Sequence, residues 1–310
     1  MNRSDERKIE ISVVIPSYKS GEGLYNCLKS VFNQTIDIPF QVIVVDSSPE
    51  DITAEVKERF PQVEVIHLKR RTLPGLARTV GAKSAKGKYV FFIDTDCIAH
   101  KDWLKLLYEK LQQGVFAAGG GVENGTPDSY VGTAEYLLEF NEMNPKAKAG
   151  TTGALPSCNL SVSRDVLEKV GYFPDFMKGE DTILCDNIIT SGHEIHFIPD
   201  AFITHKNRTG FMHFIKNQVA LGEGANETRR RTKRHGYFLI KYPVLVVFIP
   251  VYRTLIISRR LIKSDIKLFF SFISHYPLIF LGLIAYTWGF IRGPYRSGLS
   301  TEKGSRNGTS

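Results

Sequence analysis

The stretch Tyr89-Val-Phe-Phe-Ile-Asp-Thr-Asp-Cys97 is the part of the sequence that most clearly indicates the fold. Its first five residues are aromatic or β-branched, which is typical of a strand buried on both faces. Two carboxylates, Asp94 and Asp96, follow at the carboxyl end, the edge at which α/β sheets bind ligands. Carboxylate oxygens suit Mg²⁺ or Mn²⁺, and such ions usually hold a diphosphate as well. An Asp-Thr-Asp turn also commonly opens a loop, so this segment alone leaves a metal site and a plain turn both open.

The chain before this stretch alternates between apolar runs and segments of helical spacing. That rhythm predicts an α/β fold with a mostly parallel, Rossmann-like sheet. Parallel strands place their carboxyl ends on one side, so Pro16-Ser17-Tyr18, Asp46 and the pair Asp94 and Asp96 should meet in one crevice. The predicted strands are Ile11–Tyr18, Gln41–Asp46, Val63–His67 and Tyr89–Ile93, and the predicted helices are Gly23–Gln34, Asp51–Phe60 and Leu76–Ala85.

Six short segments stand out in order along the chain: Val13–Tyr18, Val44–Asp46 with Asp51–Thr53, Gly75–Gly81, Phe91–Asp96, Cys158–Val162 and Gly179–Asp181. Together they resemble the motifs of the inverting family 2 glycosyltransferases, which have the nucleotide-sugar-binding GT-A fold. The resemblance covers roughly residues 10 to 210 and depends on the order and spacing of the motifs, because each alone is weak. It implies a GT-A catalytic domain over residues 1–226.

By this resemblance, Asp96 of the DxD motif would bind a divalent ion, Mn²⁺ or Mg²⁺, that bridges the two phosphates of the donor. Asp94 would lie near the ribose or bind the same ion. The ion would act as a Lewis acid on the leaving nucleoside diphosphate. His205 would complete the metal shell, as in some GT-A enzymes, or would have only a structural role at a strand end.

The resemblance assigns the nucleobase and ribose of the donor to four residues at the ends of the first two strands: Pro16, Ser17, Tyr18 and Asp46. Arg78 would face the nucleotide phosphates with its planar fork, or would be an exposed helix residue. Asn159 would lie near the donor sugar, or would be an amide in a turn. Ser47 and Thr79 depart from the usual family residues and leave the nucleobase open, although a UDP-type donor is favoured.

The segment Gly179-Glu180-Asp181 is the second chemical centre that the resemblance indicates. Inverting transfer needs a base that takes the proton from the acceptor hydroxyl as this hydroxyl attacks the anomeric carbon. Asp181 would be that base, and Glu180 would position the acceptor or the donor. Asp181 also has the sequence context of a helix N-cap, and the two roles are compatible.

Residues 227–310 differ from the rest of the chain. They hold 15 Lys or Arg against three acids, a net charge of +12, whereas the whole chain carries +8. They predict a basic linker that includes Arg229–His235, two membrane-embedded helices at about 237–258 and 268–291, and a short polar tail. Lys241 and Arg253 limit the apolar part of the first helix, which therefore either spans with both cations at opposite interfaces or lies in the headgroups.

These features together predict a membrane-anchored glycosyltransferase at the inner (plasma) membrane, with its catalytic domain facing the cytoplasm. The expected partners are a nucleoside-diphosphate sugar, a lipid-linked saccharide or glycolipid acceptor, and anionic lipid. Nucleic acid is not expected, because the cations flank apolar segments. The product would belong to a cell-surface polysaccharide or glycolipid. Two alternatives stay open: a non-catalytic GT-A module that binds a nucleotide or a partner at the membrane, and a processive polysaccharide synthase.

Overall fold

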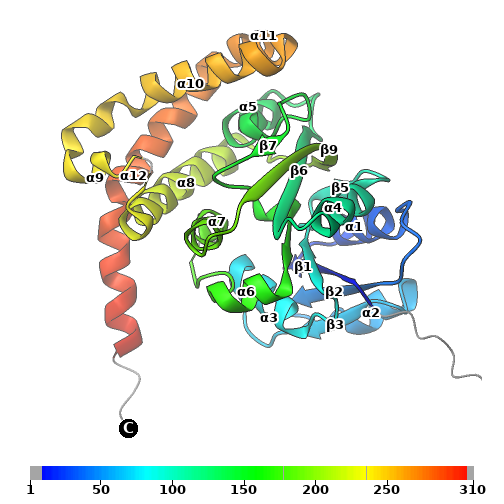
Figure 1. The fold of residues 1–310 in the computed structure, drawn as a ribbon. Coiled ribbons are helices and arrows are strands. Elements are labelled where there is room, and N and C mark those ends of the chain that lie inside the picture. The colour runs from blue at the N-terminus through cyan, green and yellow to red at the C-terminus, as the bar shows by residue number, and fades with distance from the viewer. Residues whose placement is uncertain (1–8, 177, 235, 306–310) are drawn as a thin grey trace, which may run out of the picture. The chain divides into compact units, whose positions relative to one another are not determined.

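Four strands at one side of the sheet are all parallel (Figure 1). They are β1 (Ile11–Ser17), β2 (Phe40–Asp46), β3 (Glu64–His67) and β4 (Tyr89–Phe92). This computed structural model describes residues 9–176, 178–234 and 236–305, and the side chains through residue 293. In it, β1 lies between β2 and β4, and β3 pairs with β2. The register sets Ser17 opposite Asp46, so the two strand ends meet at one edge, as predicted.

The rest of the sheet is mixed. Strand β8 is antiparallel to both β4 and β6, whereas β6 and β9 are parallel. The order across the sheet is β3-β2-β1-β4-β8-β6-β9-β5, and β7 pairs with β9. The predicted α/β class with a mostly parallel sheet is therefore confirmed. The remaining strands are β5 (Cys97–Ala99), β6 (Ala117–Asn124), β7 (Gly150–Thr151), β8 (Leu160–Ser163) and β9 (Ile195–His205).

The three helices predicted between the first strands are present. Helix α3 approaches the sheet closely, because a Cβ at Gly81 would touch the Val14 side chain and lie 3.1 Å from that of Val45. This close approach seats the residues one turn earlier, including Arg78, under the carboxyl edge of the sheet. The helices around the sheet are α1 (Glu22–Phe32), α2 (Thr53–Arg59), α3 (Pro74–Ser84), α4 (Trp103–Gln112), α6 (Arg164–Val170) and α7 (Glu180–Thr190).

The chain divides into two compact units. The first unit comprises residues up to 125 with 143–206, and the second comprises 126–142 with the residues from 207 onward. The boundary expected at residue 226 falls inside α8 of the second unit. In that unit α8 and α12 pack so closely that a Cβ at Gly222 would overlap the carbonyl of Tyr286. The helices of the second unit are α5 (Tyr130–Glu139), α8 (Phe211–Thr232), α9 (Phe238–Lys241), η3 (Pro243–Phe248), α10 (Ile249–Ser264), α11 (Ile266–Ser274) and α12 (Tyr276–Ser305).

Prolines lie at the breaks in both segments that were predicted as membrane helices. The segment 237–258 is divided into α9, η3 and α10, with Pro243 as the first residue of η3 and Pro250 as the second residue of α10. The segment 268–291, predicted as one helix, is α11 followed by α12, and the chain bends by 79° between them, just before Pro277. A proline cannot continue a preceding helix, because it lacks the N–H group and its ring clashes with the earlier turn.

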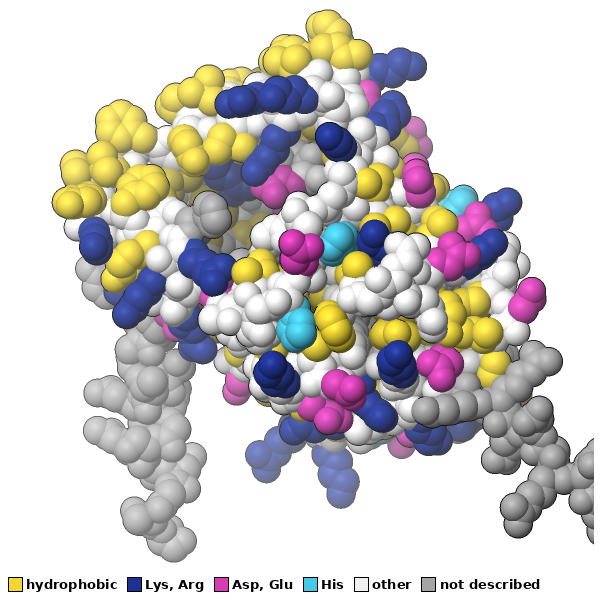
Figure 2. Space-filling view, viewed as in Figure 1, with side chains coloured by type: hydrophobic (Ala, Val, Ile, Leu, Met, Phe, Trp, Pro, Cys, Tyr) yellow, Lys and Arg dark blue, Asp and Glu magenta, His cyan; other side chains and the backbone are white. Residues whose placement is uncertain are grey.

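Among the described residues, we find no single helix whose length and apolar character suffice to cross a membrane. The bent pair Ile266–Ser274 and Tyr276–Gly293 meets that requirement when its two helices are taken together. Hydrophobic side chains gather over α9, α10 and α11, with Lys and Arg beside them (Figure 2). His235 of the predicted basic linker and the last part of the predicted polar tail, residues 306–310, lie outside the described residues.

Strand β6 provides a test of the sheet packing at Gly120. A Cβ there would overlap the carbonyl oxygen of Ala201 and lie 2.9 Å from the side-chain amide nitrogen of Asn159. We expect Gly120→Ala to lower the free energy of unfolding by about 2 kcal/mol, because neither strand can yield without loss of the β6–β9 pairing. Gly153→Ala is the control, since its Cβ would have open space within 4 Å. Equal denaturant midpoints for the two variants would contradict this packing.

Candidate functional site

Asp46, at the end of β2, is fully buried. Its carboxylate accepts hydrogen bonds from the amide of Ser48 at 3.0 Å and from the Ser48 hydroxyl at 2.8 Å. The Nδ1 atom of His67 lies 3.3 Å from the same carboxylate. Because these groups enclose it, the carboxylate holds the loop after β2 in place. The geometry therefore does not support the direct contact with a nucleobase that was predicted for Asp46.

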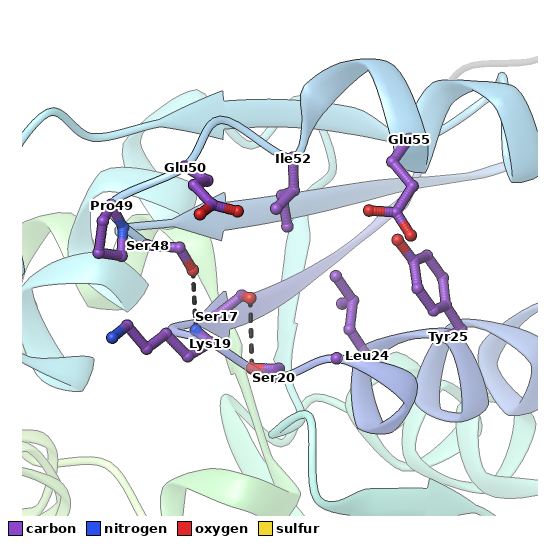
Figure 3. A pocket seen from close by; sticks show the side chains of 11 residues that line it. Ser17, Lys19, Ser20, Leu24, Tyr25, Ser48, Pro49, Glu50, Ile52 and Glu55 are labelled. Atoms are coloured by element: carbon purple, nitrogen blue, oxygen red, sulfur yellow. Dashed lines mark hydrogen bonds between the residues drawn. The ribbon is translucent and has the colours of Figure 1, made fainter.

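A cavity of about 430 Å³ opens beside Ser17, between the ends of β1 and β2 and the starts of α1 and α2 (Figure 3). The Lys19 amide donates to the Ser48 hydroxyl at 2.7 Å, and the Ser17 hydroxyl donates to that of Ser20 at 3.3 Å. Of the residues predicted to hold the nucleotide, Ser17 lines this cavity. A space of this size, with several hydroxyl groups at its wall, suits part of a small ligand.

The far wall of the cavity carries Tyr25 and Glu55 (Figure 3). Burial, together with the Glu55 carboxylate, raises the pKa of Tyr25 to about 12, so its hydroxyl keeps its proton. Pro16 lies in β1 opposite Val45, and the partly exposed Tyr18 ring lies next to Arg71, whose guanidinium is 4.7 Å from the ring centroid. Tyr18 thus keeps an aromatic surface on which a base can stack.

Arg78 of α3 joins two carboxylates from distant parts of the chain. Its guanidinium donates to Oδ1 of Asp94 at 2.6 Å and to Oε1 of Glu180 at 3.1 Å, and its side chain is 3% exposed. Burial disfavours the charged guanidinium, but the two carboxylates outweigh this effect and raise the pKa of Arg78. The ring of Phe173 lies 5.7 Å from the guanidinium carbon. Arg78 is therefore a buried bridge and not an exposed helix residue, and its contact with the nucleotide phosphates stays a prediction.

Glu180 is nearly enclosed at the start of α7. Burial and the neighbouring Asp181 carboxylate raise the pKa of Glu180 from 4.5 to about 7, although the Arg78 charge acts in the opposite direction. Gly75 of α3 permits the close approach, because a Cβ there would lie 2.9 Å from Cγ of Glu180. A carboxyl group that binds and releases its proton near neutral pH is suited to acid–base chemistry.

Asp181 is the second residue of α7 and is half-buried. Its carboxylate accepts hydrogen bonds from the amide of Thr182 at 2.7 Å and from the amide of Ser157 at 3.3 Å. Gly179, with a φ of 91°, occupies the N-cap position that the sequence suggested for Asp181. Both Glu180 and Asp181 therefore lie in the first helical turn, where the helix dipole favours negative charge.

Asp96 and His205 come together beside β5. The Nε2 atom of His205 lies 3.6 Å from Oδ2 of Asp96, and the Asp96 side chain is 47% exposed. Cys97 lies in the same cluster, whose potential ligand atoms are all within 4.8 Å of one another. Cys97 is fully buried, and a soft thiol suits Mn²⁺ or Mg²⁺ less well than a carboxylate does. Carboxylate oxygen and imidazole nitrogen together fit Mn²⁺, and the carboxylate also fits Mg²⁺. Asp94, whose side chain is 28% exposed, lies two residues before Asp96.

Asn159 lies in the protein core. Its amide nitrogen donates to the carbonyls of Gly121 at 2.8 Å and Ala201 at 3.0 Å, and its amide oxygen accepts from the Trp103 indole at 2.8 Å. The residue is fully buried. Both N–H groups are therefore used inside the protein, and the donor-sugar role predicted for Asn159 is not supported by its geometry. It instead ties β6, β9 and α4 together.

Sequence reasoning missed several residues that shape the site. Ser48 and His67 hold Asp46, Ser157 contacts Asp181, and Phe173 covers Arg78. Ser48, His67 and Ser157 lie at or beside a motif or strand end, and Phe173 lies in the loop between α6 and α7, but none of these side chains has a distinctive spacing. Their roles depend on contacts between segments that are far apart in the chain.

Comparison with known proteins agrees with this geometry. Residues 12–171 match the family described as Glycosyl transferase family 2. The glycosyltransferase AglE of Haloferax volcanii is 29% identical over 250 residues, which cover 77% of this chain and 81% of that protein. A pre-mycofactocin glycosyltransferase of Mycobacterium tuberculosis is 24% identical over 225 residues, 70% of this chain. The aligned part is 47% of that relative, so the chain spans about half of its length.

A solved structure shares the fold. The mannosyltransferase from Pyrobaculum calidifontis, in complex with GDP-Man and Mn²⁺, has a TM-score of 0.60 to this chain at 16% sequence identity. The match covers 93% of this chain and 87% of that chain. At this low identity the likeness concerns the arrangement of strands and helices.

The raised pKa of Glu180 predicts a pH-dependent stability. The folded protein keeps a proton that the unfolded chain releases, so stability should fall as the pH rises from 4.5 to about 7 and then level off. Glu180→Gln removes this titration. As the pH rises from about 5 to about 8, we expect the unfolding free energy of the wild type to fall by on the order of 2 kcal/mol relative to that of Glu180→Gln. The exposed Glu58→Gln is the control; parallel pH curves for the wild type and Glu180→Gln would refute the shift.

Proposed function

This chain belongs to glycosyl transferase family 2, and we propose that it moves a sugar from a nucleoside-diphosphate donor to a lipid-linked saccharide or glycolipid, with inversion at the anomeric carbon. Its family and its GT-A-like fold make it a glycosyltransferase. The donor, the acceptor, the stereochemistry and the role of each residue are part of the proposal.

The Arg78 bridge is the observation that carries this proposal. One guanidinium contacts Asp94 of the DxD motif at 2.6 Å and Glu180, the neighbour of Asp181, at 3.1 Å. The acidic end of β4 and the acidic start of α7 are therefore held on either side of a single side chain. Transfer from a nucleotide sugar needs this proximity, because a divalent ion stabilises the leaving diphosphate while a base takes the proton of the attacking hydroxyl.

We assign the chemical roles as follows. Asp96 and His205 would hold Mn²⁺ or Mg²⁺, which supplies Lewis-acid stabilisation of the diphosphate when it is bound. The acceptor oxygen forms a bond to the anomeric carbon, and the bond from that carbon to the diphosphate oxygen breaks with its electron pair on the diphosphate. Asp181 takes the acceptor proton, since its half-buried carboxylate is open to solvent. Glu180, held by Arg78, positions the reactants.

The donor is proposed to bind at the edge formed by β1 and β2. Tyr18 would stack on the nucleobase, and Ser17 would contact the ribose from the wall of the 430 Å³ cavity. A UDP-type donor is proposed from the family resemblance. The Pyrobaculum calidifontis mannosyltransferase binds GDP-Man, so a guanosine donor is the natural comparison in any test.

We propose that the acceptor is presented by a membrane, at the cytoplasmic face of the inner (plasma) membrane. The bent pair α11–α12 and the many exposed apolar side chains of the second unit support this. The cations at Arg229, Arg230 and Arg231 would favour an anionic lipid surface. Anchoring raises the effective concentration of the enzyme near a lipid-linked acceptor. The product would enter a cell-surface polysaccharide or glycolipid.

A thermal-shift screen tests the donor site. UDP-, GDP-, dTDP- and CDP-sugars are compared with and without Mn²⁺, for the wild type and for Asp96→Ala. We expect one nucleotide class to raise the unfolding temperature in the presence of Mn²⁺ and Asp96→Ala to abolish that rise, because the diphosphate is held through the ion. Lys57→Ala is the control on an exposed helix of the same unit. A rise that is equal in Asp96→Ala would reject the metal assignment.

Asp181→Asn tests catalysis separately from binding. We expect it to lower kcat by roughly 10²- to 10⁴-fold while the donor-dependent thermal shift stays unchanged, because an amide cannot accept the acceptor proton. Turnover is measured as release of nucleoside diphosphate in the presence of a lipid acceptor extract. The exposed Asp200→Asn is the matched control. Unchanged turnover in Asp181→Asn would transfer the base role to another group, and no turnover in the wild type with any donor would favour a non-catalytic binding module.

A further inference from the structure

Most of the exposed large apolar side chains of the described residues lie between Phe238 and Ile291. The exposed fractions are 78% for Val244, 64% for Leu255 and 65% for Phe270. Contiguous apolar surface of this kind is rare on a protein face that stays in water, and it indicates an interaction surface.

Six of these residues form one continuous strip, which we call the η3–α10 face: Val244, Val247, Phe248, Val251, Tyr252 and Leu255. They recur every three or four positions along η3 and the first half of α10, so they share one side of these consecutive helices. Val246 and Ile249 between them, and Ile257 just beyond, are buried and pack in the interior of the second unit. The two helices therefore have a sharply divided surface.

Of the two cations that limit this apolar segment in the sequence, Lys241 is exposed, whereas Arg253 is bound within the unit, as is Arg260 farther along α10. Arg253 donates to the carbonyl of Leu138 at 3.1 Å, and its guanidinium carbon lies 4.3 Å from the centroid of the Tyr286 ring. Arg260 donates to Oδ1 of Asn141 at 3.3 Å and forms an ion pair with Glu142. The sequence suggested that Arg253 would extend to a membrane interface. The structure instead uses its charge within the unit, and the η3–α10 face stays apolar.

Exposed cations lie directly after this face. Arg259, Lys263 and Lys267 are exposed at the end of α10 and the start of α11. Residues 238–293 contain seven Lys or Arg and a single acid, Asp265. The carboxylate of Asp265 caps α11 by accepting from the Lys267 amide at 3.0 Å. An apolar strip beside a basic fringe complements a surface that is anionic outside and apolar beneath, which is the chemistry of an anionic lipid bilayer.

We propose that the η3–α10 face binds in the plane of an anionic bilayer, at the boundary between headgroups and acyl chains, with Arg259, Lys263 and Lys267 at the lipid phosphates. This inference rests on the membrane association proposed above and specifies its surface and its mode. The 16 residues of α10 extend about 24 Å, less than the roughly 30 Å of a hydrocarbon core. The bonds of Arg253 to Leu138 and of Arg260 to Asn141 also hold the opposite side of α10 against the protein, so the helix lies on the bilayer and does not cross it.

Vesicle flotation of the full chain tests the surface. Vesicles of phosphatidylcholine alone are compared with vesicles that also contain phosphatidylglycerol. We expect the wild type to float with the anionic vesicles and Val247→Glu/Leu255→Glu to bind at least about tenfold less, since two charges enter the apolar strip. Gln62→Glu/Gln113→Glu adds the same charge on exposed positions of the first unit and should float like the wild type. Equal flotation of all three proteins, or no flotation of the folded wild type, would overturn the proposal.

Two readouts separate the possible failures. The donor-dependent thermal shift reports on the first unit, so a protein that floats but binds no donor would reject the proposed function and leave this surface standing. A protein that binds donor but does not float would do the reverse. Light scattering measures the oligomeric state: if Val247→Glu/Leu255→Glu turned a dimer into a monomer and left flotation unchanged, a second copy would cover the face, and the bilayer proposal would fall.

Depth-dependent quenching tests the in-plane mode. In the variant Leu255→Trp/Trp288→Phe, the new indole is in the strip and the other tryptophan, Trp103, is fully buried in the first unit. We expect stronger quenching by lipids brominated near the headgroup than by lipids brominated near the bilayer centre. Stronger quenching by the deep bromines would show that α10 crosses the bilayer and would overturn this mode.

Discussion

The arrangement of the site depends on the single buried charge of Arg78. A guanidinium with almost no exposure to water is stable only when it is paired, and its two partners are Asp94 and Glu180. If either carboxylate moved away, the buried guanidinium would lose one of its two hydrogen-bonded partners. The bridge thus fixes the distance between the end of β4 and the start of α7, and α3 is held against β1 by the close approach at Gly81. The sheet, α3 and α7 act as one support for the acidic groups.

This support places two adjacent carboxylates in different surroundings. Glu180 is nearly enclosed, and its pKa is raised to about 7, mainly because burial disfavours its charged form. Asp181 is half-buried and accepts hydrogen bonds from the amides of Thr182 and Ser157. Neighbouring acids whose surroundings differ in this way can divide the work of positioning and proton transfer. The same division appears on the cation side, where Asp94 is held by Arg78 while Asp96 is half exposed beside His205.

The second unit also has charged side chains in different surroundings. Its helices carry many cations in an apolar sequence, and some of these cations are bound within the unit while others are exposed to solvent. Arg253 is bound to a backbone carbonyl within the unit, and the partly exposed Arg260 is bound to an amide and a carboxylate of the same unit, whereas Arg259, Lys263 and Lys267 face solvent. Inward pairing removes charge from one side of α10, so the exposed side becomes continuously apolar. The prolines at 243, 250 and 277 lie where the two apolar segments are broken into separate helices.

The sequence by itself determined the elements and the chemistry at their ends. Strand and helix periods predicted the parallel core, the motifs predicted the family, and the position of Asp96 and His205 at strand ends allowed a metal site, because these signals are local or follow from strand direction. The breaks at the prolines could also have been read from the sequence. Only the tertiary structure decided which polar groups are consumed by the protein itself. The bond between Arg78 and Glu180 joins residues 102 positions apart, and Asn159 and Asp46 proved to be enclosed. Burial and partner choice are set by long-range packing, which residue spacing does not record.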